Sequence, residues 1–254
     1  MKSILYAELT NTDIEKAIVD GYMVIVPMGC IENHGPHLPV DMDNYILSTV
    51  LPRALRIANR NHGVKGLLLP VVPFGQATEH MQFAGTISLK SKTHLDLLSD
   101  VLDSLIEHGL KKILVIQGCG GHFLHSAALE AKKRAVDSGK RVNIYVESSN
   151  YYEIGKKHFG QNIQDFHAGE FETSLCLADR AELVNKKLIP AVKKKGFVWE
   201  SAWMMKEISE TGVTGNPEKA SAEIGKKIWD DLVAHWVARL RYFFEGSGGS
   251  LTSR

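Results

Sequence analysis

A segment rich in acidic and imidazole side chains is the part of this sequence best suited to chemistry. It runs from Gly29 to Asp43 and holds Glu32, His34 and Asp43 between a strand-like run and a helix-like run. Carboxylate oxygens and imidazole nitrogens are ligands that Zn²⁺ and Mn²⁺ accept. Because its glycines and prolines break regular structure, we expect a shaped loop at the carboxyl end of a strand, where open α/β sheets place their sites.

The spacing within this loop brings side chains together. Glu32 and His34 are two positions apart, so both leave the same face of an extended backbone. Asp43 follows at the start of the next helix, and a chain that loops back can set all three around one ion. The alternative is that the acids are solvated and that Asp43 only caps a helix. The whole cluster predicts zinc or manganese, one or two ions per chain, with Asp43 as the best bridging ligand.

A second segment follows a central apolar run. Ile113–Ile116 is typical of a short buried strand, and it leads into a glycine-rich turn that carries Cys119 and His122. Small residues in such a turn let the backbone approach an ion or a ligand closely.

A third segment, His167–Ser174, opens another helix-like run with a histidine, two acids and two hydroxyls. Glu170 and Glu172 would also suit an ordinary first helical turn, where the helix dipole favours negative charge. That explanation suits one of the two acids well, but it does not account for the adjacent His167.

The order of these blocks resembles that of the creatininase (creatinine amidohydrolase) family. Residues 29–39 read Gly-Cys-Ile-Glu-Asn-His-Gly-Pro-His-Leu-Pro, and Asp43 follows, which is similar to the first block of the family. Residues 75–86, 167–174 and 212–217 are similar to its later blocks. Together they span nearly the whole chain, and they are specific for the family but not for a substrate.

The block after the central strand departs from the family pattern. Family members carry a metal-binding histidine where this chain has Cys119, and His122 replaces the last asparagine. A thiolate is a good zinc ligand, so Cys119 could replace the imidazole and favour zinc. Alternatively His122 or His125 supplies the ligand, or one metal position is empty. Creatinine-cleaving members carry a glutamate at Gly121, so creatinine is not the expected substrate, and Glu170 could supply the missing carboxylate.

The resemblance implies a fold, a reaction and a set of site residues. The expected fold is α/β, a three-layer α/β/α sandwich of the creatininase type with a mostly parallel, mixed central sheet. The expected activity is metal-dependent hydrolysis of a small cyclic amide, a formamide or a related carbonyl compound by metal-activated water. The expected catalytic residues are His167, as proton donor to the leaving group, and Glu172. The expected metal ligands are Glu32, His34, Asp43, Cys119 and Glu170. The expected substrate-binding residues are His37, His80, His122 and Trp203.

Two other functions stay open. A metal-dependent hydrolase or isomerase of a polyhydroxy cyclic ketone, derived from a sugar or an inositol, would need more hydrogen-bonding groups, which His37, His80, Gln117 and His122 could provide. A non-catalytic metal-binding protein could have lost activity through the change to cysteine, although the retained His167 and Glu170 argue against this. The sequence contains no Gly-x-Ser-x-Gly motif of a serine hydrolase.

Composition favours a soluble enzyme that acts on a small molecule. The 254 residues are 44% apolar and 23% charged, with a net charge of +1, so we expect no nucleic-acid or membrane partner. No apolar run reaches the roughly 20 residues that cross a bilayer, and the first residues turn acidic before a signal-peptide core can form. Three scattered cysteines do not make a disulfide framework, so we expect a cytoplasmic protein.

The remaining pattern alternates helices and strands, which predicts helices on both faces of a sheet. The expected helices are 13–20, 45–59 with an interruption near Pro52, 92–108, 123–137 and 218–244; the expected strands are 22–27, 65–73, 113–116 and 141–146. We expect one domain over residues 1–245 and a flexible tail over 246–254. The irregular segment 197–215 holds Trp199 and Trp203, which the resemblance favours as a pocket wall.

The closing helix carries apolar residues at a spacing of four, namely Ile224, Ile228, Leu232 and Trp236. This stripe indicates a core face or a subunit contact. Because members of the resembled family are commonly hexamers, we expect a homo-oligomer, and specifically a hexamer.

Overall fold

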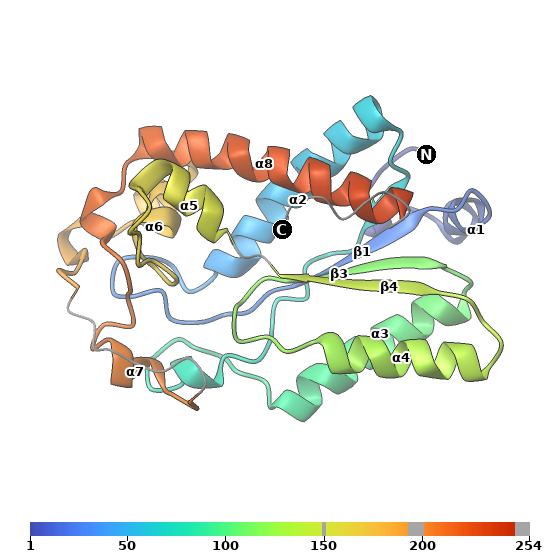
Figure 1. Ribbon diagram of the computed structural model, residues 1–254, viewed down its shortest axis with the longest axis horizontal. Coiled ribbons are helices and arrows are strands. Elements are labelled where there is room, and N and C mark those ends of the chain that lie inside the picture. The colour runs from blue at the N-terminus through green and yellow to red at the C-terminus, as the bar shows by residue number, and fades with distance from the viewer. Residues whose placement is uncertain (149–150, 193–200, 247–254) are drawn as a thin grey trace.

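The computed structural model describes residues 1–148, 151–192 and 201–246 (Figure 1). Within these residues the strands form one sheet in the order β2-β1-β3-β4, and every pairing is parallel. The strands are β1 (Met23–Met28), β2 (Gly66–Leu68), β3 (Lys112–Gln117) and β4 (Asn143–Ser148). The α/β prediction is confirmed, although no antiparallel strand joins the sheet in the part of the chain that the structure describes.

Both faces of the central strands are covered, as expected of a parallel sheet. All residues of β1 are buried, and alternate side chains enter two separate apolar clusters. Met23 and Ile25 pack on one face of the sheet, while Val24 and Val26 pack on the other. The near-continuous apolar runs of β1 and β3 therefore reflect burial on both sides.

Helices form the two outer layers (Figure 1). One layer contains α2 (Met42–His62), α5 (Tyr152–Phe159), α6 (Glu170–Asp179) and α8 (Ala222–Glu245); the other contains α1 (Asn11–Val19), α3 (Ser91–Glu107) and α4 (His125–Asp137). The shorter elements are η1 (Tyr6–Glu8), η2 (Thr78–His80), η3 (Ala181–Leu183), η4 (Lys186–Leu188), α7 (Met205–Ile208) and η5 (Pro217–Lys219). This arrangement is the three-layer sandwich that the sequence predicts.

The expected interruption near Pro52 is wrong, because α2 continues through it from Met42 to His62. Proline removes one helical hydrogen bond and costs about 3 kcal/mol in a helix interior. The neighbouring residues Val50, Leu51 and Ala54 are all buried. Tertiary packing of this face therefore outweighs the local cost of the proline.

Several predicted boundaries also move. The predicted strand 65–73 shortens to β2, and beyond it only Val72 makes an isolated bridge, to Met28. The strand predicted at 141–146 begins two residues later, the helix predicted from 123 begins at His125, and the helix predicted from 218 begins at Ala222. Local apolar character does not say where pairing stops, because that depends on the neighbouring strand.

The apolar stripe of α8 belongs to the core. Ile228, Leu232 and Trp236 have no exposed surface and pack against α2 and α6. Gly225 allows the closest approach, because a Cβ there would lie 1.9 Å from the backbone oxygen of Ser174 in α6. The stripe is therefore not a subunit contact, and the hexamer stays a prediction without this support.

Two expectations fall on residues that are not described: Trp199 and the tail beyond Gly246 lie outside the described ranges. Among the described helices, none is both long and apolar enough to cross a membrane.

Candidate metal centre

The candidate site lies where two neighbouring strands end. β1 and β3 are adjacent and in register, with Met28 beside Gln117. The loop after β1 leads to α2 on one face of the sheet, and the loop after β3 leads to α4 on the other. Such a divergence is a topological switch point, where open α/β sheets bind ligands. Gly118 fits because the strand ends are close: a Cβ there would lie 2.8 Å from the oxygen of Met28.

Two helix starts complete the site from the other side. α2 begins at Met42, which places Asp43 in its first turn, and α6 begins at Glu170, which places Glu172 in its first turn. Ala168, two residues before this helix, has a φ of 54°, which is rare for a residue other than glycine. Its N–H donates a hydrogen bond of 2.6 Å to Glu172 Oε2. This turn therefore fixes the Glu172 carboxylate.

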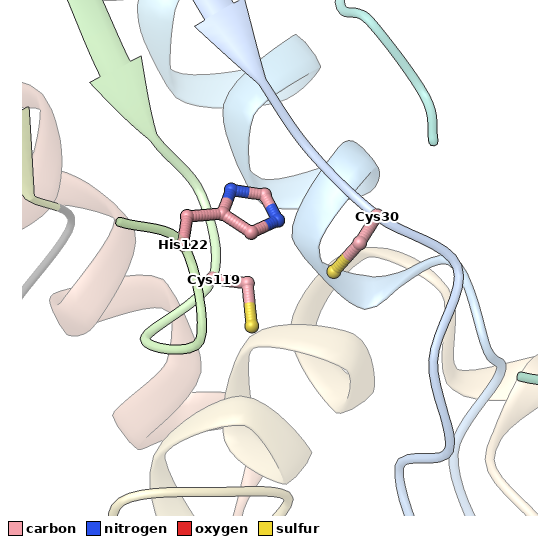
Figure 2. Close-up of side chains that lie close together, drawn as sticks. All are labelled: Cys30, Cys119 and His122. Atoms are coloured by element: carbon pink, nitrogen blue, oxygen red, sulfur yellow. The ribbon is translucent and has the colours of Figure 1, made fainter. Parts of the chain in front are cut away.

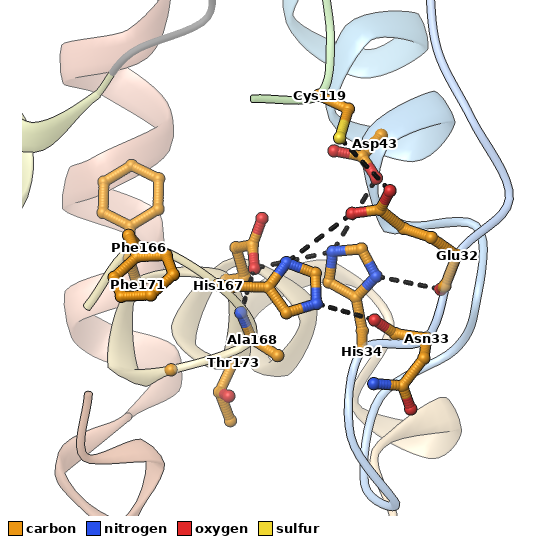
Figure 3. Close-up of polar contacts among 12 residues, drawn as sticks. Glu32, Asn33, His34, Asp43, Cys119, Phe166, His167, Ala168, Phe171 and Thr173 are labelled. Carbon is orange, nitrogen blue, oxygen red and sulfur yellow. Dashed lines mark hydrogen bonds and ion pairs between the residues drawn. The ribbon is translucent and has the colours of Figure 1, made fainter. Parts of the chain in front are cut away.

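One half of the site, here called the carboxylate side, consists of His34, Asp43, Glu172 and His167 (Figure 3). His34 Nε2 lies 3.8 Å from Asp43 Oδ2 and 3.6 Å from Glu172 Oε2. Its Nδ1–H donates to the Glu32 carbonyl at 3.1 Å. Metal-binding histidines are commonly oriented by such a bond from their other nitrogen. His34 therefore points its Nε2 at two carboxylates, as a ligand would.

The other half, here called the thiol side, consists of Cys30, Cys119 and His122 (Figure 2). Glu32 joins it to the carboxylate side, because Glu32 Oε2 accepts hydrogen bonds from Cys30 Sγ at 3.1 Å and from Cys119 Sγ at 3.2 Å. Cys30 Sγ also lies 3.2 Å from Asp43 Oδ2. Asp43 belongs to two possible ligand groups, one with Cys30 and Glu32 and one with His34 and Glu172.

The electrostatics of these buried groups are unusual. Burial, reinforced by the neighbouring Asp43, raises the pKa of Glu32 to about 8, and burial raises the pKa of Asp43 to about 6. Burial would lower the pKa of His34, but Glu172, Asp43 and Glu32 outweigh it and raise that pKa to about 10. Burial alone would raise the pKa of Glu172, yet His34 lowers it to about 2. The carboxylates thus crowd around one cationic ring and would gain from more positive charge.

His167 lies at the edge of this cluster in a defined tautomer. Its Nε2–H donates to the Asn33 carbonyl at 2.6 Å, which leaves the Nδ1 lone pair free, 3.6 Å from Glu32 Oε1. Burial and the nearby His34 lower the pKa of His167 to about 3, so the ring is neutral. A neutral ring with a free nitrogen facing the carboxylates can accept a proton or bind an ion.

Glu170 is placed differently from the expectation. It is buried, and its Oε2 accepts a very short hydrogen bond from the backbone N–H of Asn216. It joins none of the ligand groups formed by the described residues. In this structure Glu172 holds the position beside His34 and Asp43, and Glu170 holds the loop before η5.

The residues expected to contact substrate divide into two sets. His37, His80 and His122 are buried around the site: His37 Nε2 lies 2.9 Å from Thr173 Oγ1, and His80 Nε2 lies 3.7 Å from Glu32 Oε1. Trp203 is half-buried in the segment before α7, which contacts η2 and thus the element of His80. Its role as a pocket wall stays a prediction. His125, one alternative ligand, is exposed at the start of α4.

The space next to Gly121, where a larger residue would place its side chain, is occupied by another side chain. A Cβ at Gly121 would lie 2.1 Å from Glu79 Oε1. The Glu79 carboxylate therefore fills the space beside the glycine, and burial raises its pKa.

The sequence analysis did not include Cys30 among the ligands, although a signal was present. Cys30, Glu32 and His34 are successive members of one alternating series, so the rule that paired Glu32 with His34 also applies to Cys30. Apolar packing is the commonest role of a buried thiol, so a cysteine at this position by itself predicts a small packed residue and not a ligand.

These donors fit a divalent ion. In each group three donor atoms, drawn from oxygen, nitrogen and sulfur, lie within 4.8 Å of one another, and His34 is oriented by a backbone carbonyl as ligating histidines are. Divalent ions would also supply the positive charge that the buried carboxylates lack. The residues are therefore suited to hold one ion on each side, with Asp43 between them.

Comparisons with known proteins identify the family of this chain. The family model described as creatinine amidohydrolase matches residues 7–240. The mycofactocin precursor peptide peptidase of Mycobacterium ulcerans (strain Agy99) is 29% identical over 253 residues, covering 90% of this chain and 88% of the relative. The creatinine amidohydrolase of Pseudomonas putida is 26% identical over 207 residues, covering 72% and 75%. The solved structure named "Creatininase Mn" superimposes with a TM-score of 0.82 at 21% identity, covering 96% of this chain and 100% of that chain.

Proposed function

The chain belongs to the creatininase family of hydrolases, and we propose that it cleaves an amide bond with the help of divalent ions held at the two sides of the site. The observation that carries this proposal is the double membership of Asp43. Its carboxylate lies in one ligand group with Cys30 and Glu32 and in another with His34 and Glu172. A carboxylate placed between two donor sets would suit a pair of ions, as found in two-metal hydrolases.

The bound ions would supply a water of lowered pKa and would polarise the carbonyl of the substrate. The protein holds the donors in place before anything binds. His34 is fixed by the Glu32 carbonyl, and Glu172 is fixed by the N–H of Ala168. Because these partners are backbone groups of the same loops, the ligands need little rearrangement on binding.

His167 would move the proton. Its Nε2–H is held by the Asn33 carbonyl, so Nδ1 is the atom free to act. Nδ1 takes a proton from the attacking water and returns it to the nitrogen of the leaving amine, which cannot depart as an anion. The sequence interpretation of His167 as a proton donor describes the second of these steps, and the neutral ring makes the first one possible.

A peptide is the substrate class to test first. The relative that is 29% identical over nine-tenths of this chain is named for a peptide, and a peptide bond presents the carbonyl and leaving nitrogen that His167 can serve. Gly121 leaves no carboxylate where creatinine-cleaving members have one, which argues against creatinine. The small cyclic amides and formamides expected from the sequence also present an amide carbonyl, so they remain alternative substrates to be tested beside the peptides.

A substrate panel tests the proposal. Protein freed of metal with a chelator is reloaded with zinc or with manganese and given short peptides, cyclic amides and formamides, with amine release as the readout. We expect hydrolysis of at least one peptide, dependent on metal and lost in His167→Asn. Hydrolysis that survives chelation, or a panel with no amide cleaved under any loading, would contradict the proposal.

The homo-oligomer, specifically a hexamer, is proposed from the family resemblance alone. Light scattering at micromolar concentration should give a mass several times that of one chain. A monomer mass would refute it without affecting the proposed activity.

A further inference from the structure

The thiol side of the site has a feature that the proposed function does not need. His122 is 1% exposed, and neither of its ring nitrogens has a hydrogen-bond partner among the described residues. A buried polar atom that is left unpaired destabilises the folded state. A bound metal ion, coordinated by one ring nitrogen, would give this ring the partner that it lacks among the described residues.

The surroundings of His122 hold its ring in place. The ring packs edge-on against His94 with centroids 4.5 Å apart. Gly75 makes room for it, since a Cβ there would lie 2.3 Å from His122 Nε2. Packing thus fixes the imidazole beside the two cysteines.

The two sulfur atoms are near enough to share one ion with this ring. Cys30 Sγ, Cys119 Sγ and a ring nitrogen of His122 lie within 4.8 Å of one another, and the three side chains converge from two loops (Figure 2). Ligands of one tetrahedral zinc ion lie roughly 3.5–3.8 Å apart, given bonds of about 2.3 Å to sulfur and 2.0 Å to nitrogen. Small side-chain rotations would therefore complete the geometry.

Glu32 is placed to be the fourth donor. Its Oε2 lies 3.1 Å from Cys30 Sγ and 3.2 Å from Cys119 Sγ. The backbone N–H of Gly121 also donates to Cys119 Sγ at 3.3 Å. An N–H directed at sulfur stabilises the thiolate form that binds metal.

We propose that Cys30, Cys119 and His122, together with the Glu32 carboxylate and the shared Asp43 carboxylate, form a thiolate site that selects zinc. Soft thiolate donors prefer zinc, whereas carboxylates and water suit manganese. The carboxylate side would accept either metal, while the thiol side would discriminate between them. The proposal deepens the metal-dependent function proposed above, since it says which ion one of its two positions takes.

Cobalt(II) tests the proposal by absorption rather than by activity. Cobalt is titrated into the metal-free full chain under anaerobic, reducing conditions, and thiolate ligation appears as a sulfur-to-cobalt charge-transfer band in the near ultraviolet. We expect that band in the parent, about half of it in Cys30→Ser and in Cys119→Ser because each removes one of two sulfurs, and none in the double variant. His122→Ala should keep the band and shift the visible bands that report the coordination geometry.

Cys176→Ser is the matched control. Cys176 is also fully buried, but it lies in α6, where its Sγ donates to the Arg180 carbonyl at 3.7 Å. A serine there keeps a donor for that carbonyl and should leave the cobalt spectrum unchanged. Cobalt binding by the parent without a near-ultraviolet band, or an undiminished band in either site variant, would overturn the proposal.

A second measurement avoids substitution, in case a variant does not fold. X-ray absorption of the zinc-loaded parent should show sulfur at about 2.3 Å, averaging near one sulfur per zinc when both positions are filled. A shell made only of nitrogen and oxygen would refute the thiolate site. The two proposals fail separately: sulfur ligation without amide cleavage would leave the zinc site standing and remove the proposed function, whereas cleavage without sulfur ligation would do the reverse.

Discussion

The two sides of the metal centre are positioned by different forces. On the carboxylate side three of the four side chains have a backbone partner: His34 contacts the Glu32 carbonyl, Glu172 the Ala168 N–H, and His167 the Asn33 carbonyl. On the thiol side His122 is held by packing against His94 and Gly75, and its nitrogens have no hydrogen-bond partner among the described residues. Backbone hydrogen bonds thus orient the histidines of the carboxylate side, whereas packing orients the histidine of the thiol side.

This difference shows how much each side depends on an ion. Hydrogen bonds keep the carboxylate side ordered whether or not metal is bound. Without metal, repulsion between the neighbouring carboxylates destabilises this side. The thiol side has unpaired nitrogens that only a ligand would pair, so more of its stability should come from the ion. Metal that binds the folded state alone stabilises it by mass action, and this gain should be larger on the thiol side.

The largest effect is expected from replacing Asp43, the residue that both sides share. Asp43→Asn keeps the size of the side chain but loses the charge that lies between the two ligand groups. We expect kcat/KM for the best peptide to fall by about four orders of magnitude or more, because activation of water is lost with the metal. Elemental analysis should show depletion at both positions.

Asp41→Asn is the control for that change. Asp41 lies two residues earlier, before the start of α2, and pairs with Arg180 at 3.1 Å near the surface. It should retain metal and activity. If Asp43→Asn lost only one ion, the two sides would not share a ligand.

The next effect separates proton transfer from metal binding. His167→Asn removes Nδ1, the only free nitrogen of that ring, and should lower kcat by about a hundredfold or more. Metal content should stay near that of the parent, because the other carboxylate-side donors remain. A variant that loses metal as fully as Asp43→Asn would show that His167 is a ligand instead.

A smaller effect is expected from a substitution that makes the donors of the thiol side more like those of the carboxylate side. Cys119→His replaces one sulfur donor of the thiol side with an imidazole, which suits zinc and also binds other divalent metals. We expect the ratio of activity with manganese to activity with zinc to rise about tenfold. The ratio should not change in Cys176→Ser, and an equal ratio in parent and Cys119→His would mean that the thiol side does not set metal choice.

The smallest effect concerns acid stability of the metal-free protein. Burial and the nearby His34 lower the pKa of His37 to about 4, against an ordinary value of 6.5. The folded state therefore holds this ring neutral, and the unfolded chain binds the proton first as the pH falls. Its contribution to the free energy of unfolding is complete above pH 6.5 and is lost between pH 6.5 and about 4. Urea unfolding of His37→Gln, which cannot take up that proton, should show a shallower decline over this range, and an unchanged decline would contradict the assignment.

The sequence predicted the carboxylate side better than the thiol side for a physical reason. Glu32, His34 and Asp43 come together because alternation in the loop and the start of α2 are both local features. The choice between Glu170 and Glu172 is different. These residues lie about 200° apart around a helix, so only one can face the site, and the face is set by how α6 packs on α8 and on the loop at Asn216.

Long-range packing also decided the other differences. Pro52 remains inside α2 because buried neighbours hold the helix, and the predicted strand 65–73 shortens because β1 pairs with only its first residues, apart from one bridge at Val72. Cys30 and Cys119 lie close together although they follow two different strands. Alternation along the first loop predicts which way the Cys30 side chain points, but it cannot predict that Cys119 lies beside it.

The contact between Gly225 and α6 has a consequence for how the protein is made. α8 packs against both α2 and α6, the helices that carry Asp43 and Glu172. A ribosome adding about 5–20 residues per second therefore releases Asp43 roughly 10–40 s before α8 is complete. During that interval the Cys30 thiol, which is fully buried in the folded protein, is exposed to solvent. The order of synthesis thus leaves Cys30 uncovered until nearly the last described helix has formed, and a chaperone that covered residues 29–43 would protect it.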